Sequence, residues 1–397
     1  MQNRNKGITL IALIITIIIL LILVGVSINL AIKGDLFGSA EKAVSGTNDK
    51  TAQEQTRVDE LMGELGRVEE QQRQDNLPGT RVTENTKYVS NGKTAWIPKG
   101  FTVSGIKSEQ SIDNGLVIYD IPEGTTVDWT NPDSVKTKYN QFVWIPVEVK
   151  STDTENSIAS FYRSEWTANA STGGDRTAGL STNYTEPDST NDTADKTGIA
   201  DQITELTKSI YKYGGFYIGR YEAGTAAPRT SGSSQTEEFV VQQDKYPYIY
   251  ITWGKSMSDV SEGAVYLCNN LYSSTNTNYG ATSMLCSGVS WDSMLDFVKD
   301  SSHSVTDSAT WGNYYNSETY KVYRGSLYSN SGWSTANTTT GTEVTKNSSV
   351  LLTTGATERN SSKNIYDVAG NCWERTTESD SSSYRVDRGR QLQPRWF

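Results

Sequence analysis

Few side chains in this sequence can carry thiol or imidazole chemistry. The chain has three cysteines, Cys268, Cys286 and Cys372, and a single histidine, His303. Three cysteines cannot form a disulfide framework, although a bridge between Cys268 and Cys286 is possible and would leave Cys372 free. His303 lies in a polar run typical of a solvated loop. A histidine-based catalytic triad or a histidine-rich metal site is therefore not expected.

Carboxylate, amide and indole groups are concentrated at 364–376, which reads NIYDVAGNCWERT. Two blocks precede it, YGGFYIGRYEAG at 213–224 and MLCSGVSWDSMLDFV at 284–298, and YRVDRG follows at 384–389. In this order they resemble the sulfatase-modifying factor family of formylglycine-generating enzymes, whose signatures are D-V-x-G-N-V-W-E-W-T and R-V-x-R-G-G-S. The resemblance covers 141–389 without a Ser/Thr-rich insertion at 151–199. It implies an α+β, loop-rich, C-type-lectin-like fold.

The resemblance implies binding rather than catalysis. Oxidases of the family hold copper with a pair of cysteines near the C-terminus, and this chain has no cysteine after Cys372. Cys372 itself stands where the family usually has Val or Ala, a position that packs. The other branch of the fold binds ligands and includes the variable proteins of diversity-generating retroelements. We therefore expect no copper and a non-catalytic protein that binds an unknown protein or glycan; a formylglycine-generating-type oxidase is the alternative.

The resemblance also implies a structural calcium site in the signature run. In the family, calcium is held by a side-chain oxygen at the position of Asp367, by the backbone carbonyls at Gly370 and Cys372, and by the carboxylate of Glu374. These are hard oxygen donors at short spacing, as calcium requires.

A simpler interpretation of the same residues needs no metal. Asp367 could be an ordinary turn residue, and Glu374 could pair with a nearby arginine such as Arg375 or Arg388. With calcium in a structural role, Trp373 is expected to pack in the core and not to contact a ligand.

The chain opens with an apolar segment, Ile8–Ile32, which follows the basic residues Arg4 and Lys6. A helix of this length crosses a bilayer, and basic flanks stay on the cytoplasmic side. The expectation is a single-pass bacterial cell-membrane protein with a cytoplasmic N-terminus and an extracellular bulk.

The residues around Gly7 also resemble a type IV prepilin leader, which would be cleaved between Gly7 and Ile8. Pilins usually carry a glutamate five residues into the mature helix, where this chain has Ala12. A minor pilin-like surface subunit is therefore a further alternative.

The rest of the chain divides by composition into a helical stalk at 34–77, a small strand-containing region at 78–140 and the lectin-like domain at 141–397. The stalk is polar, with apolar residues at helical spacing. Strands are predicted at 87–89, 95–97, 115–119, 141–147, 213–224 and 248–253, and helices at 261–271 and 290–298, the latter capped by Ser290. The insertion at 151–199 is expected to be a surface loop.

The end of the chain departs from the family pattern after Gly389, where Arg390–Phe397 replaces the expected Gly-Ser and the strands beyond it. A shifted reading frame would restore Arg-Gly-Gly-Ser, so the domain is expected to be truncated, with its ligand-binding residues beyond Gly389. The formal net charge of −10 disfavours nucleic acid as a partner, because an acidic surface repels phosphate backbones.

Overall fold

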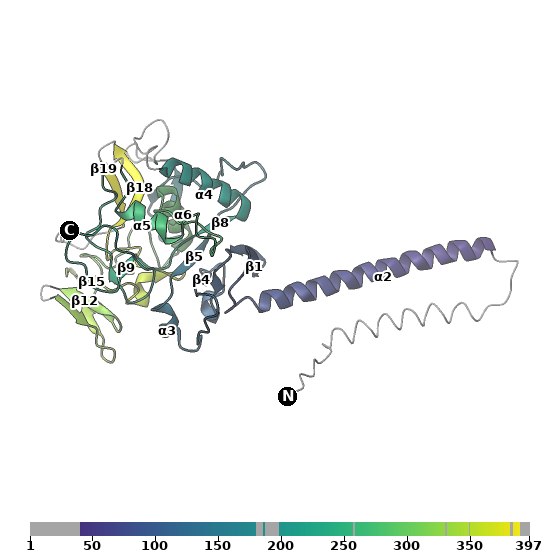
Figure 1. The fold of residues 1–397 in the computed structure, drawn as a ribbon, viewed down its shortest axis with the longest axis horizontal. Coiled ribbons are helices and arrows are strands. Elements are labelled where there is room, and N and C mark those ends of the chain that lie inside the picture. The colour runs from purple at the N-terminus through teal and green to yellow at the C-terminus, as the bar shows by residue number, and fades with distance from the viewer. Residues whose placement is uncertain are drawn as a thin grey trace. The chain divides into compact units, whose positions relative to one another are not determined.

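The computed structural model of the chain describes residues 40–179, 186, 198–256, 259–329, 332–348, 350–381 and 384–389 (Figure 1). It is a mixture of helices and many small sheets. The chain falls into two compact units, Met1–Gln71 and Gln72–Phe397. Each unit is considered by itself below.

Helix α2 (Ala40–Asp75) occupies most of the range in which the sequence predicts a stalk. Its apolar stripe is exposed, with 42% of Leu61 and 65% of Met62 accessible to solvent. A helix that buries so little gains its stability mainly from its own backbone hydrogen bonds. It ends shortly before Pro78 and Gly79, because proline and a glycine at φ +78° do not continue a helix.

The predicted transmembrane helix over Ile8–Ile32, and the single-pass membrane location inferred from it, are corrected. In the part of the chain that the structure describes, every helix is too short or too polar to cross a bilayer. α2 is long enough, but it carries charged residues along its length, and these are costly to place in hydrocarbon. The segment 8–32 and the predicted cleavage between Gly7 and Ile8 lie outside the described residues, as do residues 390–397.

The largest sheet has four antiparallel strands in the order β3 (Thr102–Val103), β4 (Val117–Tyr119), β5 (Gln141–Pro146) and β8 (Gly215–Gly219). Val143 at the middle of β5 lies opposite Val117 on one side and Ile218 on the other. β5 is thus flanked on both edges, and most of its side chains are buried because a core lies against each face.

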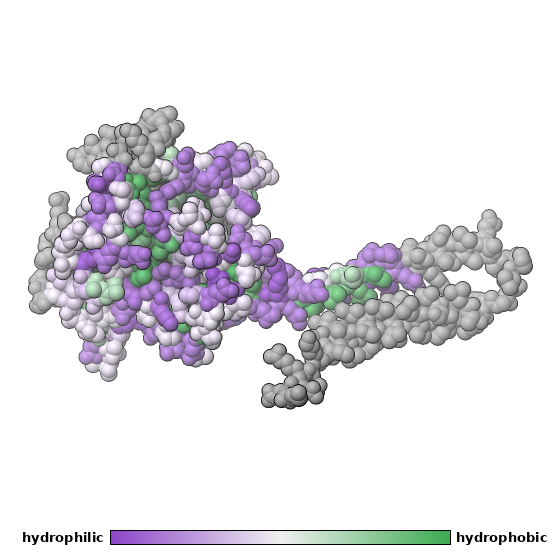
Figure 2. All heavy atoms as spheres, viewed as in Figure 1, coloured by the Kyte–Doolittle hydropathy of each residue, from purple (hydrophilic) through white to green (hydrophobic). Residues whose placement is uncertain are grey.

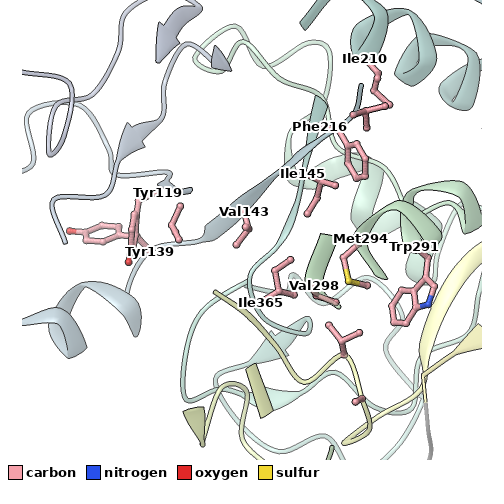
Figure 3. Packing of buried hydrophobic residues seen from close by; sticks show 14 of the residues in the cluster. Tyr119, Tyr139, Val143, Ile145, Ile210, Phe216, Trp291, Met294, Val298 and Ile365 are labelled. Carbon is pink, nitrogen blue, oxygen red and sulfur yellow. The ribbon is translucent and has the colours of Figure 1, made fainter. Parts of the chain in front are cut away.

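Alternation along β5 sends side chains into two separate cores. Val143 and Ile145 belong to a cluster that includes Met294 and Trp291 of helix α6 (Gly288–Val298) (Figure 3). Trp144 points the other way, into a cluster with Ile97 and Leu116. Successive side chains of a strand face opposite sides, so β5 contributes to both cores.

Two helices cover the central sheet on the side of the first core. Helix α4 (Ile199–Tyr213) lies along β8, and α6 lies along β5 (Figure 1). Among the described residues, the other helices are α3 (Pro132–Lys136) and α5 (Ala264–Leu271). Short 3-10 turns occur at Lys107–Glu109 and Glu358–Asn360.

The other strands form small antiparallel sheets. They are β1 (Thr86–Ser90) with β2 (Lys93–Ile97), β6 (Ser164–Thr167) with β7 (Asp175–Ala178), β9 (Gly224–Thr225) with β10 (Tyr246–Pro247), and β11 (Tyr320–Val322) with β14 (Thr342–Val344). Three more sheets are β12 (Ser326–Ser329) between β13 (Gly332–Thr335) and β15 (Leu351–Leu352), β16 (Ser361–Ser362) with β17 (Ile365–Tyr366), and β18 (Glu374–Ser381) with β19 (Tyr384–Arg388).

Several element predictions need correction. α6 is capped by Ser287, whose Oγ accepts a hydrogen bond from the Ser290 N–H (3.1 Å), and not by Ser290 itself. The run 248–253 is irregular because Tyr250 adopts φ +57°, which no extended strand permits. α4 is missing from the sequence prediction, although its isoleucines and leucine at 199, 203, 206 and 210 have helical spacing.

The first part of the predicted surface insertion is built into the domain. It contains β6 and β7, and two of its arginines are largely buried. Arg163 lies between two acids, with its Nε 2.7 Å from Asp292 Oδ2 and its Nη1 in contact with Glu378. This buried ion pair ties the insertion to both α6 and β18.

Candidate functional site

The signature run 364–376 forms the turn of one hairpin, a tight loop and the start of β18. Asp367, Gly370 and Asn371 all have positive φ, at +63°, +121° and +67°. At Gly370 a Cβ atom would collide with the carbonyl oxygen of Asn313, so only glycine fits there. The positive φ values and the lack of space at Gly370 therefore determine the backbone conformation of the loop.

Asn371 holds this loop to the neighbouring strand. It is fully buried, and its Oδ1 accepts hydrogen bonds from the Leu352 N–H (2.8 Å) and from Asn313 Nδ2 (3.1 Å). Its Nδ2 donates to Leu352 O (3.1 Å) and to Glu222 Oε2 (2.7 Å). One amide side chain thus satisfies four groups in a place that water does not reach.

Glu222, which follows β8, completes the support of the loop. Its Oε1 accepts a hydrogen bond from the Cys372 N–H (3.0 Å). Burial and the negative charge of Asp367 raise the pKa of Glu222 well above its ordinary value. Sequence reasoning missed both Glu222 and Asn371. Glu222 could have been suspected, because it is an acidic residue shortly after an apolar strand in a block that resembles the family.

Asp367 is 2% exposed and only one of its oxygens is well paired. Its Oδ2 accepts a hydrogen bond from the Gly355 N–H (2.7 Å). Its Oδ1 makes no well-formed hydrogen bond among the described residues, although the Asn360 amide lies close enough to lower the pKa of this carboxyl. Burial raises the pKa of Asp367 to about 7.

Glu374 presents a second unpaired oxygen. Its Oε2 is buried without a hydrogen-bond partner in the described structure, and it lies against Gly389, where a Cβ atom would collide with it. Burial, followed by repulsion from Glu222 and Asp367, raises the pKa of Glu374 well above its ordinary value.

The alternative in which an arginine pairs with Glu374 does not hold in the structure. Arg375 pairs with Asp387 (3.0 Å), and Arg388 with Glu378 (2.5 Å). Among the described residues, no lysine or arginine forms an ion pair with Glu222, Asp367 or Glu374. We refer to these three side chains as the acidic trio.

Two features of the acidic trio would favour a cation nearby. Two of its carboxylates have an unpaired buried oxygen, and each member has its pKa raised by burial, with repulsion from another member adding to this at Glu222 and Glu374. Bound Ca²⁺ would relieve that repulsion with the oxygen ligands it prefers. In the described part of the chain, no three His, Cys, Asp or Glu side chains could hold a metal by themselves. The backbone carbonyls of Gly370 and Cys372 would therefore have to supply further ligands.

Trp373 is not a core residue, so the sequence prediction is wrong here. It is 45% exposed, although both of its neighbours are partly buried. The loop thus presents an indole ring to solvent from a backbone that Glu222 and Asn371 fix on its inner side.

The cysteines and the histidine show no sign of reactive chemistry in the structure. Cys268, Cys286 and Cys372 are all free thiols, so the possible bridge between Cys268 and Cys286 does not form. Burial raises the pKa of all three, that of Cys268 to about 12. His303 is less solvated than predicted, since its Nδ1 lies 2.9 Å from Asp300 Oδ1 and its ring packs edge-on against Trp311.

Comparison of the chain with models of protein families, with curated proteins and with solved structures finds no match. The likeness to the sulfatase-modifying factor family therefore depends on the sequence blocks alone.

Proposed function

We propose that this chain is a non-catalytic binding protein whose recognition surface includes the loop around Trp373. The observation that carries the proposal is the exposed indole of Trp373 on a loop anchored by Asn371 and Glu222. A large aromatic side chain on a rigid backbone supplies contact area at small entropic cost. Exposed tryptophans are correspondingly frequent among the residues that dominate binding energy.

Calcium has a structural part in this proposal. Asp367 and Glu374 would supply side-chain oxygens, and Gly370 and Cys372 would supply carbonyl oxygens. The ion would neutralise the acidic trio, whose members otherwise repel one another. Trp373 lies between two of these four residues in the chain, so a fixed cation would restrict the movement of its backbone.

The visible surface of the domain offers little room for a broad apolar contact. The face shown in Figure 2 is mainly hydrophilic or neutral, with only narrow strips of hydrophobic residues. Obligate protein interfaces are larger and more apolar than this. We expect the ligand to be an unknown glycan or a weakly bound protein that uses Trp373 as its anchor.

The test is a binding screen of the full chain against an array of immobilised glycans and a displayed random-peptide library, with calcium present. Trp373→Ala should weaken binding to any ligand found by at least tenfold. Tyr323→Ala is the matched control, because Tyr323 is also exposed, at 52%, but lies outside the loop. Equal binding by the wild type and Trp373→Ala would contradict the proposal.

A further inference from the structure

A groove with a volume of about 530 Å³ lies outside the signature loop, in the part of the chain before the region of family resemblance. Its lining includes Arg81, Thr102 of β3, the residues from Pro122 to Val127, and Trp129. This volume lies within the range of small-molecule sites.

One wall of the groove is a rigid indole. The ring of Trp129 stands edge-on to Tyr119 of the core, with 5.3 Å between ring centroids. The ring also packs closely against Gly105 and Gly79. A Cβ atom at Gly105 would collide with the indole, and a Cβ atom at Gly79 would lie 3.0 Å from its Nε1. The indole is therefore held in one place before any ligand arrives, which lowers the entropic cost of binding.

A preformed turn also lines the groove. The Thr125 N–H donates to Pro122 O (3.2 Å), and Gly124 has φ +74°, as the third residue of a type II turn requires. The hydroxyl groups of Thr125 and Thr126 belong to exposed residues of this wall.

Two buried polar atoms of residues that line the groove have no partner. Thr102 is 1% exposed, and its Oγ1 makes no hydrogen bond within the described structure. The Nε atom of Arg81 is also buried and makes no hydrogen bond among the described residues. Arg81 Nη2 donates a long hydrogen bond to Asn278 O (3.4 Å). An unmet buried donor or acceptor is unfavourable, because it has lost its hydrogen bonds to water. A ligand that met these groups would recover part of that cost.

We propose that this groove binds a neutral saccharide. A sugar ring has an apolar face of C–H bonds that packs on an indole, and its hydroxyl groups pair with guanidinium, carboxylate and threonine hydroxyl groups. The groove has one cation, Arg81, and one anion, Glu123, so it has no charge excess for a phosphate or an acidic sugar. An apolar ligand would leave Thr102 Oγ1 and Arg81 Nε unpaired.

The experiment probes an array of immobilised neutral and acidic oligosaccharides with the full chain. Thr102→Val keeps the size and branching of the side chain and removes the unpaired hydroxyl, so the free protein should be as stable as the wild type or more so. Binding to neutral oligosaccharides should fall by roughly threefold to tenfold in Thr102→Val, since one hydrogen bond is lost. Trp129→Phe and Arg81→Lys should weaken binding in the same way. Thr335→Val, an exposed strand position, is the matched control and should bind as the wild type does.

Failure to retain any neutral oligosaccharide would overturn the inference, and so would retention unchanged in Thr102→Val, Arg81→Lys and Trp129→Phe. Binding lost in Trp373→Ala but kept in the groove variants would also overturn it while leaving the proposed function intact. Stability of each variant is followed by thermal unfolding. Because Thr102→Val removes an unpaired group, loss of binding in that variant is separable from loss of fold.

Discussion

Asn371 is the single side chain on which the shape of the signature loop depends most. Asn371→Ala removes four hydrogen bonds and leaves groups of Leu352, Asn313 and Glu222 unpaired in the interior. We expect the free energy of unfolding to fall by about 2–4 kcal/mol, as for other disrupted buried networks. Urea denaturation measures this. Asn316→Ala at an exposed position is the control, and an equal effect of the two substitutions would refute the role of Asn371.

Thiol reactivity separates the binding proposal from the oxidase alternative at the residue scale. The pKa of each cysteine is raised by burial, so the reactive thiolate is scarce at neutral pH. In the folded chain at pH 8, a chromogenic disulfide reagent should label none of the three within minutes, and all three after unfolding in urea. Rapid labelling of a native thiol would contradict this and favour redox chemistry.

At the scale of elements, a buried ion pair joins the 3-10 turn at Lys107–Glu109 to the end of β8. Glu109 Oε1 lies 2.8 Å from Arg220 Nη1 and 3.1 Å from Lys136 Nζ. Burial alone would raise the pKa of Glu109, but these two cations and hydrogen bonds from Ser104 and Tyr119 outweigh it, so the pKa is lowered.

The lowered pKa has a definite consequence for pH dependence. Because Glu109 loses its proton more readily in the folded state, its stabilisation is fully present above the ordinary glutamate pKa and is lost as pH falls through the folded value. Glu109→Gln should therefore cost about 3 kcal/mol at pH 7. The cost should shrink as pH falls below the ordinary glutamate pKa and through the lowered folded value, because the wild type then becomes uncharged as well. Denaturation at several pH values measures the difference. A constant gap across pH, or an equal gap for exposed Glu343→Gln, would be inconsistent with the pairing.

Local patterns explain which elements could be predicted. The 3.6-residue spacing of Trp291, Met294 and Val298 predicts α6 because all three side chains enter one core. The run 248–253 has the alternation of a strand. However, the backbone carbonyls of Ile249 and Ile251 accept hydrogen bonds from Arg229 Nε and Arg375 Nε, and not from a neighbouring strand. Those partners are distant in sequence, so no local pattern reveals them.

The candidate site was also predictable only where its residues lie close together in the sequence. Asp367, Gly370, Cys372 and Glu374 could be identified because they lie together in one signature. Glu222, which fixes the same loop from about 150 residues away, could not be assigned to it without the fold. Nor could the exposure of Trp373, since a tryptophan next to buried residues is more often buried itself.

For the whole molecule, the two units should lose structure in separate steps. All ten tryptophans lie beyond residue 95, in the unit that contains every hydrophobic core cluster of the described residues. α2, by contrast, has mostly exposed side chains, and an isolated helix melts gradually. Far-ultraviolet ellipticity should therefore begin to fall on heating before tryptophan emission changes in one sharp transition. Coincident transitions would contradict this independence.

The measurement that tests the central claim most directly is thermal unfolding of the full chain across a calcium titration. If the acidic trio and its loop bind calcium, millimolar Ca²⁺ should raise the melting temperature by several degrees, since a ligand at 100 times its Kd adds about 2.7 kcal/mol. The shift should vanish in Asp367→Ala and Glu374→Gln, and persist in the exposed control Glu343→Gln. An unchanged melting temperature of the wild type at millimolar Ca²⁺ would contradict a calcium-organised recognition loop.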